Sequence, residues 1–143
     1  MKNIIVILAI TVYFTLSQAF AEVGKLGEPN NVSRVIAVEM TFNRFNPSEI
    51  NVKRGETIKF ILKNISKKKH EFMIDTMDNL KKHAEMMRKY PDMEHTESNM
   101  VTVASGKTGE LIWQFTEVGT IDFACPMHGH SKGMRGKIIV TDN

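Results

Sequence analysis

Short segments in which apolar and polar residues alternate run through most of the chain, and they restrict its fold more than any other feature. Over residues 34–42 the apolar side chains fall on one face, at Ile36, Val38, Met40 and Phe42, which is the period-two pattern of a half-buried strand. Seven further segments of strand character are separated by turns: 45–52, 57–62, 72–74, 100–103, 110–115, 120–125 and 137–141. About eight short strands predict an all-β fold, a Greek-key β-sandwich.

One segment has a different period and interrupts the strands. Leu80, Ala84 and Met87 recur at helical spacing, so we predict a helical insertion over residues 75–90. Asp78 is the predicted N-cap, because a short acceptor side chain before an apolar run satisfies free backbone N–H groups.

The N-terminal segment has the pattern of a secretory signal peptide. A lysine precedes an apolar run over residues 4–16, and Ala19-Phe20-Ala21 has the small-x-small form of a cleavage site. The alternative is an uncleaved anchor, but the run is shorter than the roughly 20 residues that span a bilayer. We therefore predict a signal peptide over 1–21, a flexible lead-in over 22–33 and one domain over 34–143. The product is expected in a bacterial periplasm, free of the membrane and monomeric.

Charge argues against one class of partner. The formal net charge is only +3, and short basic runs such as Lys67-Lys68-Lys69 and Lys81-Lys82 are separated by acidic residues. This pattern is typical of a solvated surface, whereas nucleic-acid binding needs a sustained basic stripe. We expect no nucleic-acid partner.

The chain has one cysteine, Cys125, which lies beside His128, His130 and Met134 near the C-terminus. A single cysteine forms no internal disulfide, and an exposed thiol is at risk of oxidation in an oxidising compartment. An inert core cysteine is the simpler interpretation. However, thiolate, imidazole and thioether together are a soft donor set that selects copper, and two His, one Cys and a distant Met form a blue-copper site. His70, at the start of a predicted strand, is the obvious second imidazole.

These motifs resemble those of the cupredoxins, the small blue-copper fold. The resemblance rests on the segment around Cys125, on the stretch from Phe45 to Gly55 and on the pair Asn64 and His70. Over most of residues 34–141 the chain is most similar to the copper-tolerance cupredoxins of bacterial periplasms (CopI-like). The supporting stretches are His70-Glu-Phe-Met and the segments 82–95, 106–115 and 134–137.

The resemblance implies the ligands of one copper ion. Azurin-like members have the pattern Cys-x4-His-x3-Met, which Cys125, His130 and Met134 match in full. The plastocyanin-like pattern, Cys-x2-His-x4-Met, fits Cys125 and His128 but misses the methionine by one position. The implied ligands are therefore His70, Cys125, His130 and Met134, with His128 as the less favoured alternative. Glu71 departs from the family, since azurin-like members often have Asn after the first His.

A second group of soft side chains surrounds the predicted helix. Thioethers suit Cu(I), so Met86, Met93 and His95 are candidates for a second copper site. The alternative is that methionines here fill core gaps or cover the surface.

Three classes of function remain to be separated. The resemblance implies copper tolerance, in which the protein binds or oxidises copper, or electron transfer with a periplasmic redox partner. A multicopper enzyme is the third class, but its multinuclear centre needs several His-x-His pairs, and His128-Gly-His130 is the only one in the sequence. We therefore expect a copper-binding protein and not an enzyme.

Overall fold

The computed structural model describes residues 24–142. The predicted signal peptide over 1–21 lies outside the described residues. No helix within 24–142 is long and apolar enough to cross a membrane.

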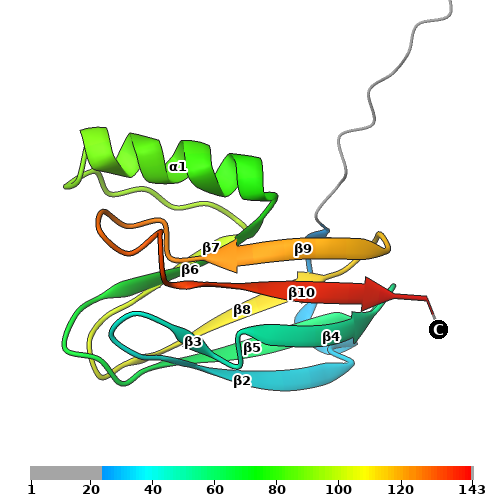
Figure 1. Cartoon of the computed structure of the whole chain (residues 1–143). Helices are drawn as coiled ribbons and strands as arrows, with labels where there is room; N and C mark the ends of the chain where they lie inside the picture. Colours follow the sequence, from blue (N-terminus) through cyan, green and yellow to red (C-terminus); the bar gives the residue numbers. More distant parts are fainter. Residues whose placement is uncertain (1–23, 143) are drawn as a thin grey trace, which may run out of the picture.

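The chain forms two five-stranded sheets packed face to face, with one helix at one end (Figure 1). The first sheet has the order β1-β8-β5-β2-β3 and the second the order β4-β10-β9-β6-β7. The strands are β1 (Lys25–Leu26), β2 (Arg34–Met40), β3 (Phe45–Asn46), β4 (Glu49–Lys53), β5 (Thr57–Asn64), β6 (His70–Asp75), β7 (Met100–Val103), β8 (Thr108–Gln114), β9 (Gly119–Ala124) and β10 (Arg135–Thr141). The predicted all-β sandwich with one helical insertion is confirmed, with ten strands in place of about eight.

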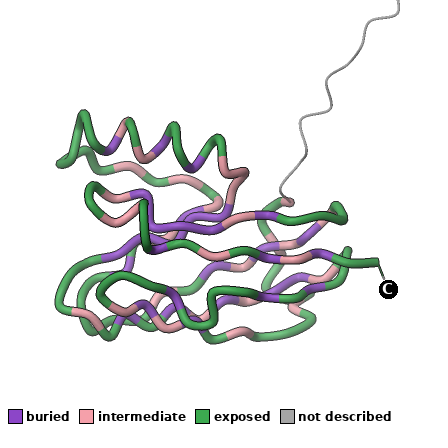
Figure 2. The backbone as a smooth tube through the Cα atoms, viewed as in Figure 1, coloured by how far each residue is buried: buried purple, intermediate pink, exposed green. Residues whose placement is uncertain are grey.

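The core lies between the two sheets, and along most strands buried positions alternate with more exposed ones (Figure 2). Ile58, Phe60 and Leu62 of β5 are fully buried, as their alternation predicts. Phe72 of β6 lies at the centre of an aromatic cluster, with ring centroids 5.4 Å from Phe60, 5.5 Å from Phe45 and 5.0 Å from Phe123. Aromatic side chains bury large apolar areas, so this cluster joins the two sheets.

The strand predicted over 45–52 is in fact two strands in different sheets. β3 pairs with β2, and β4 pairs with β10 in parallel. The Asn46–Pro47 peptide bond between them is cis, and proline cannot donate to a ladder. The prediction for Phe42 is also wrong: β2 ends at Met40 and the Phe42 side chain is 64% exposed.

Near the N-terminus, the predicted lead-in contains ordered elements that its composition does not reveal. β1 pairs with β8, and a 3-10 helix follows at Pro29–Asn31.

The helix α1 (Met77–Lys89) covers part of the β6 and β9 side of the second sheet (Figure 1). Its N-cap is Thr76, whose hydroxyl accepts a bond from the Asn79 backbone N–H at 3.3 Å. The prediction of Asp78 as the cap is therefore wrong by two residues. Leu80, His83 and Met87 are buried on the face that packs inward, because residues three and four apart share one helix face.

Candidate metal centre

Three of the predicted ligands converge at the end of the sandwich where the β9–β10 connection lies. His70 is the first residue of β6, Cys125 follows β9, and His130 lies in the turn between β9 and β10. Nδ1 of His70 lies 3.9 Å from the Cys125 sulfur, and Nδ1 of His130 lies 3.5 Å from it. The two imidazole rings lie 4.8 Å apart between centroids.

These distances fit one metal ion held by both nitrogens and the sulfur. Bonds of about 2.0 Å to nitrogen and about 2.3 Å to sulfur, at tetrahedral to trigonal angles, put nitrogen and sulfur roughly 3.5–3.7 Å apart. The observed separations of 3.5 and 3.9 Å bracket that range. Two imidazoles and a thiol are also the donor set of the trigonal blue-copper site. The residues therefore fit a copper ion.

Met134, the fourth predicted ligand, is fully buried at the end of the same loop. Its backbone carbonyl accepts a bond from the Cys125 N–H at 2.9 Å, and its N–H donates to the His130 carbonyl at 3.0 Å. Gly129 adopts φ +83° inside this turn, a conformation that favours glycine. The loop is thus closed by its own backbone, which holds Cys125, His130 and Met134 together.

Burial controls the protonation of these ligands. It raises the pKa of the Cys125 thiol to about 11, although backbone N–H groups of Glu71 and Met127 oppose this; the Glu71 N–H lies 3.4 Å from the sulfur. Burial, with the neighbouring His130 and Lys68, lowers the pKa of His70 to about 4. The imidazole is therefore neutral and ready to bind, while a metal must displace the thiol proton.

His128, the less favoured ligand, lies outside this group. Its side chain is exposed, and it lines a surface hollow with Phe42, Lys68 and His130. The ligand assignments themselves stay predictions that substitution experiments must test.

Asn64 holds the segment that leads into His70. Its side-chain amide donates to the carbonyls of Lys68 and Val103 at 2.8 and 2.9 Å, and its oxygen accepts from the Ser66 N–H at 3.0 Å. Asn64 is buried, so these bonds replace water and fix the loop before β6.

We predict that Asn64→Ala lowers the free energy of unfolding by about 2–3 kcal/mol, because three hydrogen bonds are lost and buried carbonyls lose their donor. Urea denaturation measures this. Asn51→Ala, at an exposed position of β4, is the control and should stay within about 0.5 kcal/mol. Equal losses in the two variants would contradict the role of Asn64.

The residues predicted for a second copper site are not all together. Met93 and His95 line one hollow, whereas Met86 lines another with His83 and Glu97. His95 instead lies beside His83, with their Nε2 atoms 2.7 Å apart. The sequence prediction overlooked His83, although its place between Leu80 and Met87 on one helix face was a usable signal.

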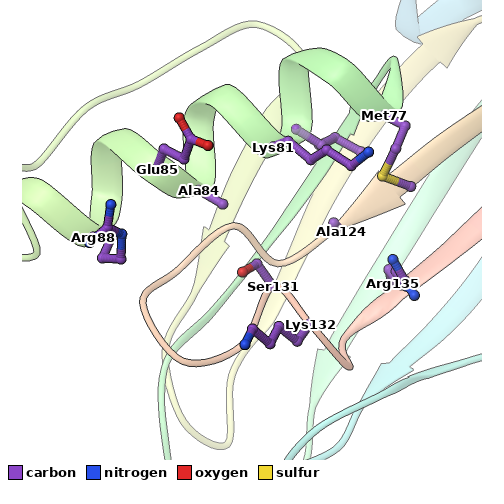
Figure 3. A pocket seen from close by; sticks show the side chains of 10 residues that line it. Met77, Lys81, Ala84, Glu85, Arg88, Ala124, Ser131, Lys132 and Arg135 are labelled. Atoms are coloured by element: carbon purple, nitrogen blue, oxygen red, sulfur yellow. The ribbon is translucent and has the colours of Figure 1, made fainter.

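A hollow with a basic lining separates α1 from the loop that carries His130 (Figure 3). Lys81 and Arg88 of the helix face it from one side, and Lys132 and Arg135 line the other, with Glu85 as the acidic member of the lining. Positive charge therefore gathers beside the candidate metal centre.

Comparison with known proteins supports the interpretation of this site. The family described as Cupredoxin-like domain matches residues 4–140. The copper-resistant cuproprotein CopI of Rubrivivax gelatinosus is 43% identical over 119 residues, which cover 82% of this chain and 72% of that protein. CopI of Pseudomonas aeruginosa is 33% identical, over 86% of this chain and 83% of that protein. CopI of Vibrio cholerae is 34% identical, and the match spans 60% of that protein.

Solved structures show the same fold. Auracyanin B superposes with a TM-score of 0.68 at 15% identity, over 82% of this chain and 94% of that chain. Sodium-dithionite-reduced auracyanin from Roseiflexus castenholzii gives a TM-score of 0.64 at 22% identity, over 76% of this chain and 98% of that chain. With a family match across most of its length, CopI relatives and a sandwich that brings His70, Cys125 and His130 together, this chain belongs to the cupredoxin family.

Proposed function

We propose that the protein binds one copper ion that His70, Cys125, His130 and Met134 would hold, and that it acts in copper tolerance. The observation that carries this proposal is the convergence of two imidazole Nδ1 atoms on the single thiol, in a chain 43% identical to a copper-resistant cuproprotein. When bound, copper supplies a centre that changes between Cu(I) and Cu(II).

The protein's own contribution is to hold the donors and exclude water. The thiol, His70 and Met134 are each fully buried, and His130 is half-buried at the surface end. A closed loop and a packed core keep this geometry nearly constant, so either oxidation state can bind without large rearrangement. We propose binding, not catalytic turnover, as the role.

We also propose that the protein is exported to a periplasm after removal of residues 1–21. Two features support this: the N-terminal sequence pattern, and a lone thiol that burial and a metal would protect from oxidation. Lysates fractionated into periplasm and cytoplasm, with mass spectrometry of the mature N-terminus, test it.

A deletion strain tests copper tolerance directly. We expect the strain to stop growing at copper concentrations that the parent survives, and to recover with the intact gene but not with Cys125→Ser. The matched control, His128→Ala, should restore growth. A Cys125→Ser gene that restores full tolerance would overturn the proposal.

Electron transfer is the second candidate function, and one observation favours it. Beside the half-buried His130 lies the exposed ring of Phe42 (64% exposed), in the same hollow as Lys68 and His128. An apolar patch next to a metal ligand suits brief docking of a redox partner. Slower respiration in the deletion strain at low copper would favour this role, and normal respiration with copper sensitivity would favour tolerance.

Copper should also stabilise the fold, because its ligands come from distant parts of the sandwich. With free Cu(II) at 100 times its Kd, we predict stabilisation of about 2.7 kcal/mol and a rise in Tm of roughly 10 °C. Differential scanning calorimetry of metal-free and copper-loaded protein measures this. Cys125→Ser is the comparison and should lose most of the shift. An equal rise in Tm in both proteins would show that copper stabilises the fold by binding somewhere other than Cys125.

A further inference from the structure

A second group of metal-binding side chains lies outside the Cys125 centre. Glu71 of β6, His83 of α1 and His95 of the loop after α1 each direct one ligand atom to a common point, and these atoms all lie within 4.8 Å of one another. Successive residues of a strand point to opposite faces. His70 therefore turns toward Cys125, while Glu71, the next residue, turns toward α1.

Both imidazoles of this group have a polar partner near their other nitrogen. Nδ1 of His83 lies 3.4 Å from a carboxylate oxygen of Glu97, and Nδ1 of His95 lies 3.4 Å from the backbone carbonyl of Met93. A proton on each Nδ1 leaves each Nε2 as an acceptor that faces the common point. Imidazoles that bind metals almost always have such a partner, either a carboxylate or a carbonyl.

Glu71 adds a buried carboxylate to the group. It is only 5% exposed, and its Oε2 has no hydrogen-bond partner among residues 24–142. Burial raises the pKa of Glu71 and lowers that of His83. A buried carboxylate oxygen without a hydrogen-bond partner is costly, and a cation between it and the two imidazoles would reduce that cost.

We infer that Glu71, His83 and His95 form a second metal site, for a divalent transition metal. Two imidazole nitrogens and one carboxylate oxygen suit Cu(II) or Zn(II), and Cu(II) binds most tightly in the Irving–Williams order. Two nitrogens bound to one ion at about 2.0–2.1 Å lie roughly 2.8–3.4 Å apart, close to the 2.7 Å between the two Nε2 atoms. The site opens to a hollow that Met87, Met93 and Thr102 also line.

This site differs from the Cys125 centre in a measurable way. It has no thiolate, so Cu(II) there produces no intense visible absorption. Its occupancy can therefore be followed by electron paramagnetic resonance, as the nitrogen- and oxygen-ligated Cu(II) signal that His95→Ala removes. The competing explanation is a hydrogen-bond network among His83, His95 and Glu97 that only anchors the loop to α1.

Equilibrium dialysis of the purified protein against micromolar Cu(II) separates the two explanations. We expect two copper ions per wild-type chain, and one in Cys125→Ser with a spectrum showing nitrogen and oxygen ligands. His95→Ala should bind one ion and keep the visible colour, which shows that it is folded. Glu71→Gln, of nearly equal shape, should weaken the affinity for the second ion by about 100-fold or more. Even the loss of a group that only hydrogen-bonds to a metal ligand typically lowers metal affinity about 10–100-fold. The control, His128→Ala, should bind two.

Either of two results overturns the inference: one ion per wild-type chain in a protein that shows the intense visible band, or two ions in the folded His95→Ala protein. A different outcome is that the copper-loaded wild-type protein is colourless while the Cys125→Ser protein still binds copper. That outcome would refute the proposed Cys125 centre and leave the second site intact. Failure of the two proposals is therefore distinguishable.

Discussion

We expect Cys125→Ser to abolish the intense visible absorption that a copper–thiolate centre would give the wild-type protein in Cu(II). The band arises from charge transfer between a thiolate and copper, and the chain contains only this one cysteine. Serine is similar in size, but its hydroxyl is a hard and weakly acidic donor in place of the soft thiolate. Absorption spectra of both proteins at equal copper loading measure the loss, which should be complete.

Two histidine variants sharpen this result. His130→Ala should lose or strongly shift the band, because its Nδ1 lies 3.5 Å from the sulfur. His128→Ala should keep it, because that side chain is exposed and lies outside the converging group. A coloured Cys125→Ser protein would refute the thiolate centre, and reversed behaviour of the two histidines would reassign the ligand.

We expect Phe72→Ala to lower the free energy of unfolding by about 3–5 kcal/mol, the usual cost of truncating a large aromatic core residue. Phe72 is fully buried and contacts the rings of Phe45, Phe60 and Phe123. Truncation leaves a cavity in the core between the sheets, two residues along β6 from His70. Urea denaturation followed by fluorescence measures the change.

Phe42→Ala is the matched control, since the same atoms are removed from a ring that is 64% exposed. Its stability should stay within about 0.5 kcal/mol of the wild type. If the two variants were equally destabilised, the aromatic cluster would not be the centre of the core.

Local patterns predicted much of the fold. The alternation in Ile58, Phe60 and Leu62 identifies a strand and its buried face, because side chains on a strand have a period of two. The helical spacing of Leu80 and Met87 identifies α1 in the same way. These signals depend only on neighbouring residues, so a single sequence contains them.

Element ends were predicted less well, because neighbours in space decide them. Thr76 caps α1 where Asp78 was expected. Phe42 continues the alternation of β2, but the strand partner ends at Asn64, which pairs with Met40, and the ring is left in solvent. The alternation of apolar residues in the sequence does not indicate where the partner strand ends.

The sequence by itself determined the strand and helix periods, and it placed Cys125, His130 and Met134 in one short loop that its own backbone can close. Only the tertiary structure decided which residues from other parts of the chain lie beside that loop. Antiparallel pairing of β6 with β9 sets Met73 opposite Ala124, which brings His70 to the thiol from 55 residues away. The same strand turns Glu71 to the opposite face, toward His83 and His95. Such contacts depend on long-range strand pairing and helix packing, whose partners no local pattern specifies.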